Sequence, residues 1–297
     1  MHTTETDLAL VGRDNVFVSI FESNSVDSTK PLLSTLNDSL SNLNVNHRII
    51  TNDDEARHWP YPQSRERIEY LANARNKAME PLQSPDPTVR LENWNEYTTV
   101  VFLNDAWFSW EDVVRLIATE TEDGGDYDLA CGMDFGWLTE RVGLYDTWVA
   151  RDICGTPLRP FFPYVKDPVS ARKVRDEQPF AVSACWNGMV AFPSGPFLCS
   201  LASPPLVTPL QFHPSPFQAC DHSECFLMSY DLHRLYNTTE RPARIVMNPQ
   251  VRVAYEQNWW KWQNVVLRVP IIRFWVGKLE FLFPCCRIGE REGGRWL

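Results

Sequence analysis

The hydrophobic and polar positions at the start of the chain alternate in a pattern that predicts a β-α-β unit. Apolar, β-branched runs at 15–21 and 45–51 have the length of buried strands, and leucines recur at helical spacing over 28–43. Both strand segments end in polar residues, which is typical of a nucleotide-binding half-sheet. No GxGxxG or GxxxxGK(S/T) sequence follows the first strand, and this disfavours the dinucleotide-binding and P-loop versions.

A second helix is predicted over Ser64–Leu82, where apolar residues recur on one face. Arg75 falls in the middle of this apolar stripe, seven residues after Ile68. A guanidinium in that position must reach solvent, pair with a carboxylate or meet an anionic ligand. Because an unpaired buried charge is costly, an internal ion pair and a phosphate contact are equally open.

The apolar run Thr98–Leu103 predicts a buried strand that ends abruptly in Asn104 and Asp105. A helix is predicted to follow, opening with Ser109 and Asp112 at the spacing of a capping box. Ligands of open α/β sheets collect outside the carboxyl ends of the strands. Asp105 is therefore a candidate ligand for a divalent metal ion that bridges nucleotide phosphates. The alternative is an Asx turn at the end of the strand.

Two later predicted strands also carry polar side chains at their ends or breaks. The strand over Tyr127–Cys131 is followed by Asp134, a second acid at a strand end. The apolar run 181–192 is interrupted by the sequence Trp186-Asn187-Gly188. Glycine within a strand marks a bulge or a close approach of the backbone to a ligand. Asn187 is thus either a partner for a sugar hydroxyl or part of a structural bulge.

Two segments in the second half combine charged residues with apolar ones. Residues 220–235 predict a helix that opens with Asp221 and Glu224, spaced either as a capping box or as two carboxylates facing the sheet edge. Residues 144–155 predict a partly exposed loop or short helix in which aromatic residues accompany Asp146, Arg151 and Asp152. The whole pattern indicates an α/β fold with a single Rossmann-like mixed sheet flanked by helices.

Composition and charge narrow the function classes. The 297 residues are 44% hydrophobic and 22% charged, as in an ordinary globular protein. The net charge of −10 and the lack of a long basic run argue against nucleic acid as the main partner. The twelve tryptophans suit either core packing or platforms for sugar rings. Eight cysteines without a CxxC pair disfavour structural zinc and allow disulfides whose pairing is open.

Neither end of the sequence predicts a membrane anchor. The first residues lack the charged-then-apolar pattern of a signal peptide. The late apolar run 265–286 is interrupted by charged residues and prolines, so it is not expected to cross a bilayer. Membrane association is expected only through an anchor preceding this sequence.

Seven motifs occur in an order that resembles a known family. They are RIEYLANARN (67–76), FLND (102–105), ACGMD (130–134), YDTWVARD (145–152), CWNGM (185–189), SEC (223–225) and VAYE (253–256). The set resembles the fungal capsule-associated α-1,3-mannosyltransferases, glycosyltransferase family 69. The resemblance runs from about Asn15 to Trp275.

The resemblance implies a GT-A-type nucleotide-sugar fold over residues 15–275, between a flexible segment at 1–14 and a tail at 276–297. It implies transfer of mannose from GDP-mannose to a glycan acceptor, with an α-1,3 linkage and retention of configuration. A divalent cofactor, Mn²⁺ or Mg²⁺, and a place in the Golgi lumen are also implied. The chain departs from many GT-A enzymes in having Asn104-Asp105 instead of Asp-x-Asp, and no histidine follows His233.

From their positions in the sequence, Asp105 is expected to hold the metal ion, with Arg75 and Asn104 near the donor diphosphate. The resemblance assigns expected roles to further residues. The Trp186-Asn187-Gly188 sequence is expected to face the transferred sugar. Asp221 and Glu224 are expected to act as an acidic pair near its anomeric carbon. The remaining candidates for donor or acceptor binding are Asp134, Arg151 and Asp152.

Two other functions fit parts of the pattern. A nucleotidyltransferase would use a similar metal and pyrophosphate edge, but it needs more converging basic residues than the first half supplies. A catalytically silent glycan-binding protein would use the tryptophans as stacking surfaces.

Overall fold

The computed structural model describes residues 12–23, 25–51, 64–84, 86, 88–90, 94–138, 141–198, 209–237 and 241–269. Most of the predicted segment 1–14 and all of the predicted tail 276–297 lie outside these residues. No helix in the described ranges combines the length and apolar character needed to span a bilayer.

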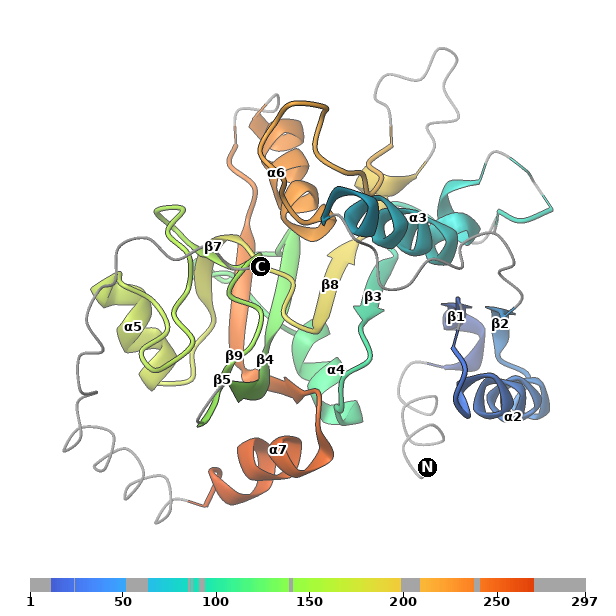
Figure 1. Ribbon diagram of the computed structural model, residues 1–297, viewed down its shortest axis with the longest axis horizontal. Coiled ribbons are helices and arrows are strands. Elements are labelled where there is room, and N and C mark those ends of the chain that lie inside the picture. The colour runs from blue at the N-terminus through green and yellow to red at the C-terminus, as the bar shows by residue number, and fades with distance from the viewer. Residues whose placement is uncertain are drawn as a thin grey trace.

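The predicted β-α-β unit is confirmed. Strand β1 (Phe17–Phe21) pairs in parallel with β2 (Asn46–Ile50), and α2 (Thr29–Asn42) connects them (Figure 1). The unit packs on α3 (Ser64–Gln83), where the Ser19 hydroxyl donates to the Ala78 carbonyl at 2.6 Å.

The prediction of a single sheet is wrong, because within the described residues β1 and β2 form a sheet of their own. The main sheet has seven strands, with β5 paired to β4 beside the path β3-β8-β4-β9-β7-β6. Its strands are β3 (Thr99–Leu103), β4 (Leu129–Leu138), β5 (Arg141–Leu144), β6 (Arg151–Asp152), β7 (Phe180–Ala184), β8 (Met189–Pro193) and β9 (Ile245–Ala254). Within this sheet, β4 and β9 are the one parallel pair among the described strands and the other pairs are antiparallel, so the predicted mixed α/β sheet is confirmed.

Alternate residues of the central strands point to opposite faces of the sheet, and each face packs into a hydrophobic core. On β8, Val190 and Phe192 join the larger core, which includes residues of α3 and α6 (Glu224–Asn237). Met189 and Ala191 join a second core with Leu116 of α4 (Trp110–Ile117). The remaining α-helices of the described residues are α5 (Pro168–Arg175) and α7 (Gln257–Lys261) (Figure 1). Hydrophobic contacts therefore place α3 and α6 across the sheet from α4.

Strand β3 is less buried than its apolar sequence predicts. It ends the path of the seven-stranded sheet and pairs only with β8 among the described strands. Its residues are half-buried or exposed, because an edge strand has a sheet neighbour on one side only.

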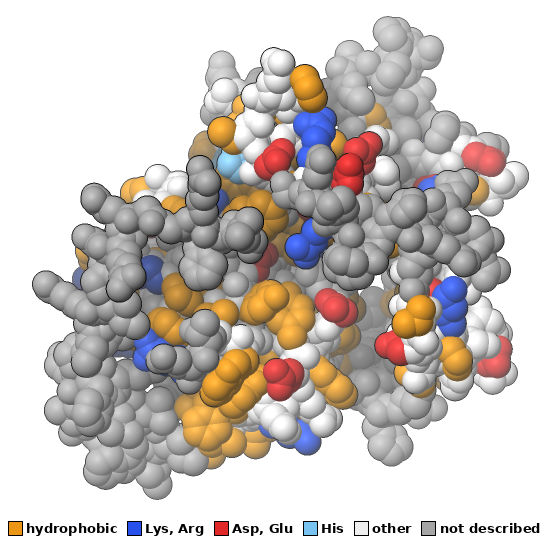
Figure 2. All heavy atoms as spheres, viewed as in Figure 1, with side chains coloured by type: hydrophobic (Ala, Val, Ile, Leu, Met, Phe, Trp, Pro, Cys, Tyr) orange, Lys and Arg blue, Asp and Glu red, His pale blue; other side chains and the backbone are white. Residues whose placement is uncertain are grey.

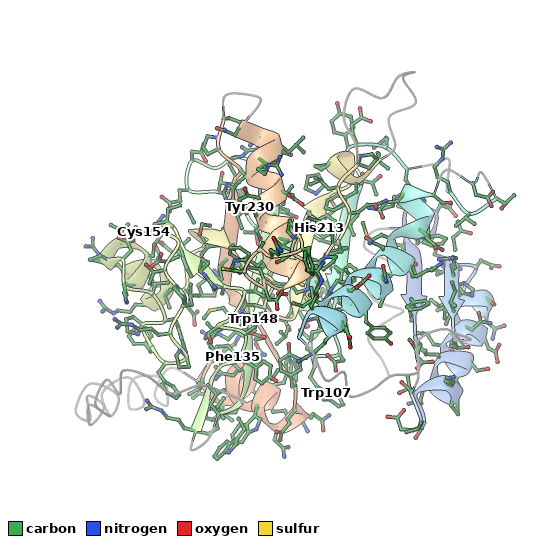
Figure 3. The ribbon with its side chains drawn as sticks, turned by 45° about the horizontal axis from the view of Figure 1, so that its top comes forward. Trp107, Phe135, Trp148, Cys154, His213 and Tyr230 are labelled. Atoms are coloured by element: carbon green, nitrogen blue, oxygen red, sulfur yellow. A yellow bond between two sulfur atoms is a disulfide. The ribbon has the colours of Figure 1, made fainter. Side chains whose placement is uncertain are left out.

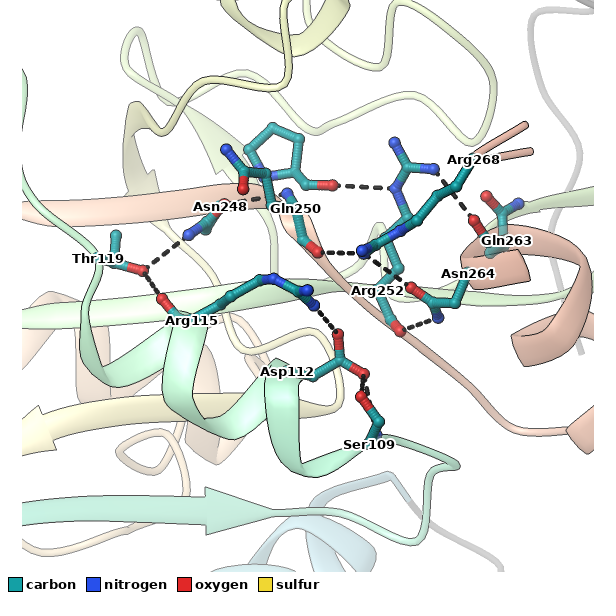
Figure 4. Close-up of polar contacts among 11 residues, drawn as sticks. Ser109, Asp112, Arg115, Thr119, Asn248, Gln250, Arg252, Gln263, Asn264 and Arg268 are labelled. Carbon is teal, nitrogen blue, oxygen red and sulfur yellow. Dashed lines mark hydrogen bonds and ion pairs between the residues drawn. The ribbon is translucent and has the colours of Figure 1, made fainter. Parts of the chain in front are cut away.

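The predicted cap of the next helix is confirmed. Ser109 and Asp112 form a capping box at the start of α4, with the Ser109 N–H donating to Asp112 Oδ2 at 2.9 Å (Figure 4). At the other end, the Asn248 amide of β9 donates to the Thr119 hydroxyl at 2.9 Å.

Asp134 does not lie at a strand end, contrary to the prediction. Strand β4 continues through it to Leu138, with a register shift against β9 between Cys131 and Met133. The shift falls at Gly132, where a Cβ would lie 2.9 Å from Val251 Cγ1 and 3.1 Å from its carbonyl oxygen. The missing side chain lets β9 approach closely, so the pairing shifts register and the strand continues.

The predicted capping box of Asp221 and Glu224 is also wrong. Glu224 is the first residue of α6 instead of the third, and the preceding Ser223 hydroxyl accepts the Cys225 N–H at 3.2 Å. Serine is a favoured N-cap residue. Glu224 is buried while Asp221 is exposed, so the two do not form an inward-facing acidic pair.

A disulfide joins Cys131 on β4 to Cys185, directly after β7. Both cysteines are fully buried. Among the described residues, Cys154, Cys220 and Cys225 are free. The bridge ties the centre of the sheet to the segment that begins at Trp186.

We predict that replacing both Cys131 and Cys185 with alanine lowers the free energy of unfolding by about 4 kcal/mol. The bond closes a loop with a sequence separation of 54, and a loop of that length constrains the unfolded chain by this amount. Urea unfolding measures the change. Cys154→Ala, which removes an exposed free thiol, is the control, and equal midpoints for the double variant and the wild type would contradict the prediction.

Candidate active site

Arg75 lies in the apolar stripe of α3, as its position in the sequence predicts. Its neighbours on that face, Ile68, Ala72 and Met79, are buried. Three aromatic rings surround the guanidinium carbon, with centroids at 4.9, 5.2 and 5.7 Å; they belong to Trp186, Phe102 and Phe212. The negative ring faces favour a cation at these distances.

The partner of Arg75 is Glu224, at the start of α6. Arg75 Nε donates to Glu224 Oε1 at 2.9 Å, and the two side chains are 15% and 3% exposed. The other oxygen, Oε2, accepts the Ser223 hydroxyl at 3.2 Å, and the Cys225 thiol donates to Oε1 at 3.4 Å. Of the alternatives that the sequence leaves open, the structure shows the internal ion pair. Both carboxylate oxygens of Glu224 accept hydrogen bonds from the protein.

Asn104 connects this ion pair to the end of β3. Its Oδ1 accepts Arg75 Nη1 at 3.3 Å and the Trp186 indole N–H at 3.2 Å. Its backbone N–H donates to the Gly188 carbonyl at 2.9 Å. The structure thus brings together four candidate residues from separate parts of the sequence: Arg75, Asn104, Trp186 and Glu224.

The Trp186-Asn187-Gly188 segment forms a tight left-handed turn before β8. Asn187 has φ 45° and Gly188 has φ 78°. A Cβ at Gly188 would lie 2.7 Å from Val253 Cγ2 and 3.3 Å from Asp134 Cβ, so the turn requires glycine. The Asn187 amide nitrogen donates to Asp134 Oδ1 at 2.7 Å and to the Asp146 carbonyl at 3.1 Å. This fully buried side chain therefore supports the turn from inside.

Asp134 is the most enclosed acid of the site. Besides Asn187, its carboxylate accepts the Asp146 N–H at 3.3 Å and the Tyr255 hydroxyl at 3.2 Å. Burial raises the pKa of Asp134 to about 7, and the nearby Asp146 charge adds to the shift. Burial and the Asp134 charge also raise the pKa of Tyr255, which favours the phenol as the donor in this bond.

Two residues of this site, Asp146 and Tyr255, are absent from the roles expected from the sequence. The half-buried Asp146 carboxylate accepts the Val149 N–H at 3.1 Å. Burial raises the pKa of Asp146, the Glu224 charge raises it further, and the Arg75 charge opposes the rise. Asp146 therefore belongs to the same electrostatic environment as the ion pair. Both residues fall in motifs that carry the family resemblance, YDTWVARD and VAYE.

Three other predicted residues have different surroundings. Arg151 Nη1 donates to the Trp148 carbonyl at 2.7 Å and to the Ala150 carbonyl at 3.0 Å, so it braces the preceding loop. Asp152 Oδ1 accepts the backbone N–H groups of Cys154 and Thr156 at 3.0 and 2.8 Å, which closes its own turn. Asp221 is exposed ahead of α6.

Asp105 follows Asn104 at the carboxyl end of β3 and is exposed. The part of the chain that the structure describes contains no group of three or more His, Cys, Asp or Glu placed to hold a metal ion. A single accessible carboxylate suits a metal ion whose other ligands are water and substrate phosphates, as Mg²⁺ is often bound.

The sequence also matches a family model. The model is described as Cryptococcal mannosyltransferase 1, and it matches residues 4–231 of the 297. No curated protein and no solved structure matches the chain.

We predict that Glu224→Leu lowers the free energy of unfolding by about 3–5 kcal/mol, because it leaves Arg75 buried without its carboxylate. The double variant Arg75→Met/Glu224→Leu should recover most of this loss, since apolar pairs often replace buried ion pairs at little cost. Urea unfolding of the three proteins measures both effects.

The more exposed pair of Arg48 and Glu80 supplies the control for this cycle. Glu80→Leu should cost at most about 1 kcal/mol, as is usual for surface ion pairs. A Glu224→Leu protein as stable as Glu80→Leu would contradict the energetic role assigned to the buried pair.

We predict that Asp134 makes the protein less stable as pH rises from about 4 to 7. The folded pKa of Asp134, about 7, exceeds the ordinary value of 3.8, so in this window the folded state holds a proton that the unfolded state releases. The loss amounts to about 4 kcal/mol at most and ends above pH 7.

Melting temperatures at several pH values between 4 and 8 test this, with Asp134→Asn as the comparison. Burial lowers the pKa of His213, but its hydrogen bonds to Pro214 and Asp231 raise it by more, so the pKa is raised overall. His213 therefore also makes the protein less stable as pH rises. That contribution is present in both proteins and cancels in the difference. If the melting temperatures of the wild type and Asp134→Asn change equally with pH, Asp134 does not cause the pH dependence.

Proposed function

We propose that this chain, which belongs to the family of cryptococcal mannosyltransferase 1, transfers mannose from GDP-mannose to a glycan acceptor. The family name supports a glycosyltransferase. The GT-A assignment, the donor, the α-1,3 linkage and the retention of configuration are our proposals. The observation that supports transfer from a nucleoside diphosphate sugar is the cation of Arg75, which donates to Asn104 at the end of β3, and Asn104 directly precedes the exposed Asp105.

This arrangement suits the departure of a nucleoside diphosphate. As the bond from mannose C1 to the phosphate oxygen breaks, its electron pair leaves with GDP and negative charge grows on the β-phosphate. A fixed guanidinium stabilises such charge without reorganisation. Arg75 keeps its orientation through Glu224 and Asn104.

The Asp105 carboxylate is the residue proposed to hold the divalent metal ion, Mn²⁺ or Mg²⁺. When bound, the metal ion would neutralise charge on the diphosphate. Asn104 is a weaker candidate for a ligand because its Oδ1 already accepts two hydrogen bonds.

The transfer is completed when an acceptor hydroxyl oxygen bonds to C1 and its proton passes to an oxygen of the departing phosphate. We favour this attack from the face of the leaving group over a double displacement. Glu224 would be the nucleophile of a double displacement, and both of its oxygens are engaged inside the protein. Asp221 is exposed and lies outside the buried cluster. Glu224 would then contribute negative charge beneath the reacting sugar without bonding to it.

A secretory location, with the Golgi lumen as the specific proposal, is supported by the disulfide between Cys131 and Cys185. Disulfides form and persist in oxidising compartments and are rare in the cytosol.

The most direct test incubates the protein with a panel of nucleotide sugars and Mn²⁺ and measures released nucleotide. The proposal expects GDP from GDP-mannose, because slow hydrolysis of the donor proceeds without the correct acceptor. Equal release from every nucleotide sugar would rule out the proposed donor. Sugar binding without release would favour a silent glycan-binding protein.

We predict that Asp105→Ala lowers turnover of GDP-mannose by on the order of a hundredfold, because the metal ion loses its protein carboxylate. Circular dichroism should show an unchanged fold, since Asp105 is exposed. Asp126→Ala, which removes an exposed aspartate elsewhere, should keep wild-type turnover and metal dependence. Normal turnover in Asp105→Ala would make the metal assignment wrong.

A further inference from the structure

The loop of residues 145–150 joins β5 to β6, and the backbone of its first residues is fixed by the buried site. The Tyr145 N–H donates to the Asp134 carbonyl at 3.0 Å, and the Asp146 N–H donates to the Asp134 carboxylate at 3.3 Å. The Asp146 carbonyl accepts the Asn187 amide at 3.1 Å. A loop held in this way presents its side chains in set positions, which lowers the entropic cost of binding a ligand.

Two large aromatic side chains of this loop face solvent. Tyr145 and Trp148 are each 53% exposed. The Tyr145 ring packs 4.7 Å from the Tyr255 ring, and it lies so close over β4 that a Cβ at Gly136 would be 2.8 Å from its Cδ2. The Trp148 carbonyl is held by Arg151 at 2.7 Å. Figure 2 shows hydrophobic side chains gathered over the centre and lower half of the face in view, with acidic side chains beside them.

The chemistry of the loop suits an uncharged sugar. The apolar C–H face of a pyranose packs on an aromatic ring, and a sugar hydroxyl can donate to a carboxylate such as Asp146. Asp146 lies between Tyr145 and Trp148 in the sequence, and the charges of Arg75 and Glu224 act on it. The negative charge of the Asp146 carboxylate repels phosphate, whereas the guanidinium of Arg75 attracts it. The loop therefore favours an uncharged sugar, and Arg75 of the ion pair favours the diphosphate.

We propose that Tyr145, Asp146 and Trp148 form the acceptor subsite. One pyranose ring of the glycan acceptor stacks on the exposed aromatic rings, and one of its hydroxyls donates a hydrogen bond to the Asp146 carboxylate. This proposal rests on the proposed mannosyl transfer and names where its second substrate binds.

The test measures the affinity of the protein for α-1,3-mannobiose by ligand-observed NMR titration. Trp148→Ala should raise the Kd on the order of tenfold, because it removes the stacking surface. Trp148→Phe, which keeps a ring, should recover part of the affinity. The control is Tyr230→Ala on α6, since Tyr230 is 52% exposed and lies away from the loop (Figure 3). Its Kd should equal that of the wild type.

Two results would overturn the acceptor subsite: no binding of mannobiose by the wild type, or an unchanged Kd in Trp148→Ala. Both are distinct from failure of the proposed function, which is tested by GDP release from GDP-mannose by the wild type without acceptor. If that release occurs and the KM for mannobiose in transfer is the same in Trp148→Ala and Tyr230→Ala, the donor assignment stands and the acceptor assignment falls.

Discussion

The constraint on which the site depends is the burial of one positive charge within an apolar face. Arg75 lies on the side of α3 that packs toward the sheet. A cation there requires a negative partner, and its N–H groups require hydrogen-bond acceptors within the protein. Glu224 supplies the charge, Asn104 supplies an acceptor, and three aromatic rings enclose the remainder. Each of these partners comes from a different part of the chain, so the cost of burying Arg75 fixes α6 and the end of β3 relative to α3.

A second layer of contacts extends this order to the loops. Trp186 both encloses Arg75 and donates to Asn104, and the turn that follows it is closed by a glycine that packs against Val253. Asn187 then connects the turn to Asp134 and to the loop at Asp146. The buried hydrogen bonds thus run from the ion pair to the aromatic surface. A substrate group bound at the aromatic surface would therefore meet side chains whose positions depend on the ion pair, and a group bound at the ion pair would meet side chains whose positions depend on the aromatic loop.

The sequence predicts the local parts of this arrangement well. The Ser109 cap and the apolar stripe that includes Arg75 each follow from spacing or from one residue type, and the structure confirms them. The order of strands and the continuation of β4 through Asp134 depend on contacts between distant segments. The shift at Gly132 requires Val251, which lies more than a hundred residues later in the chain. No local pattern contains that information.

The same reasoning explains why the acids are harder to assign than the arginine. A buried cation in an apolar stripe is conspicuous, because few surroundings tolerate it. An aspartate in a loop can close a turn, as Asp152 does, or lie in a charged cluster, as Asp146 does, and both occur within one short motif. Both accept backbone N–H groups of their own turns, Asp152 from Cys154 and Thr156 and Asp146 from Val149, but the charges of Glu224 and Arg75 act in addition on Asp146. Burial raises the pKa of Asp146, and the hydrogen bonds of its turn and the charges of Glu224 and Arg75 modify that rise, so the chemistry of this carboxylate depends on surroundings that only the fold assembles.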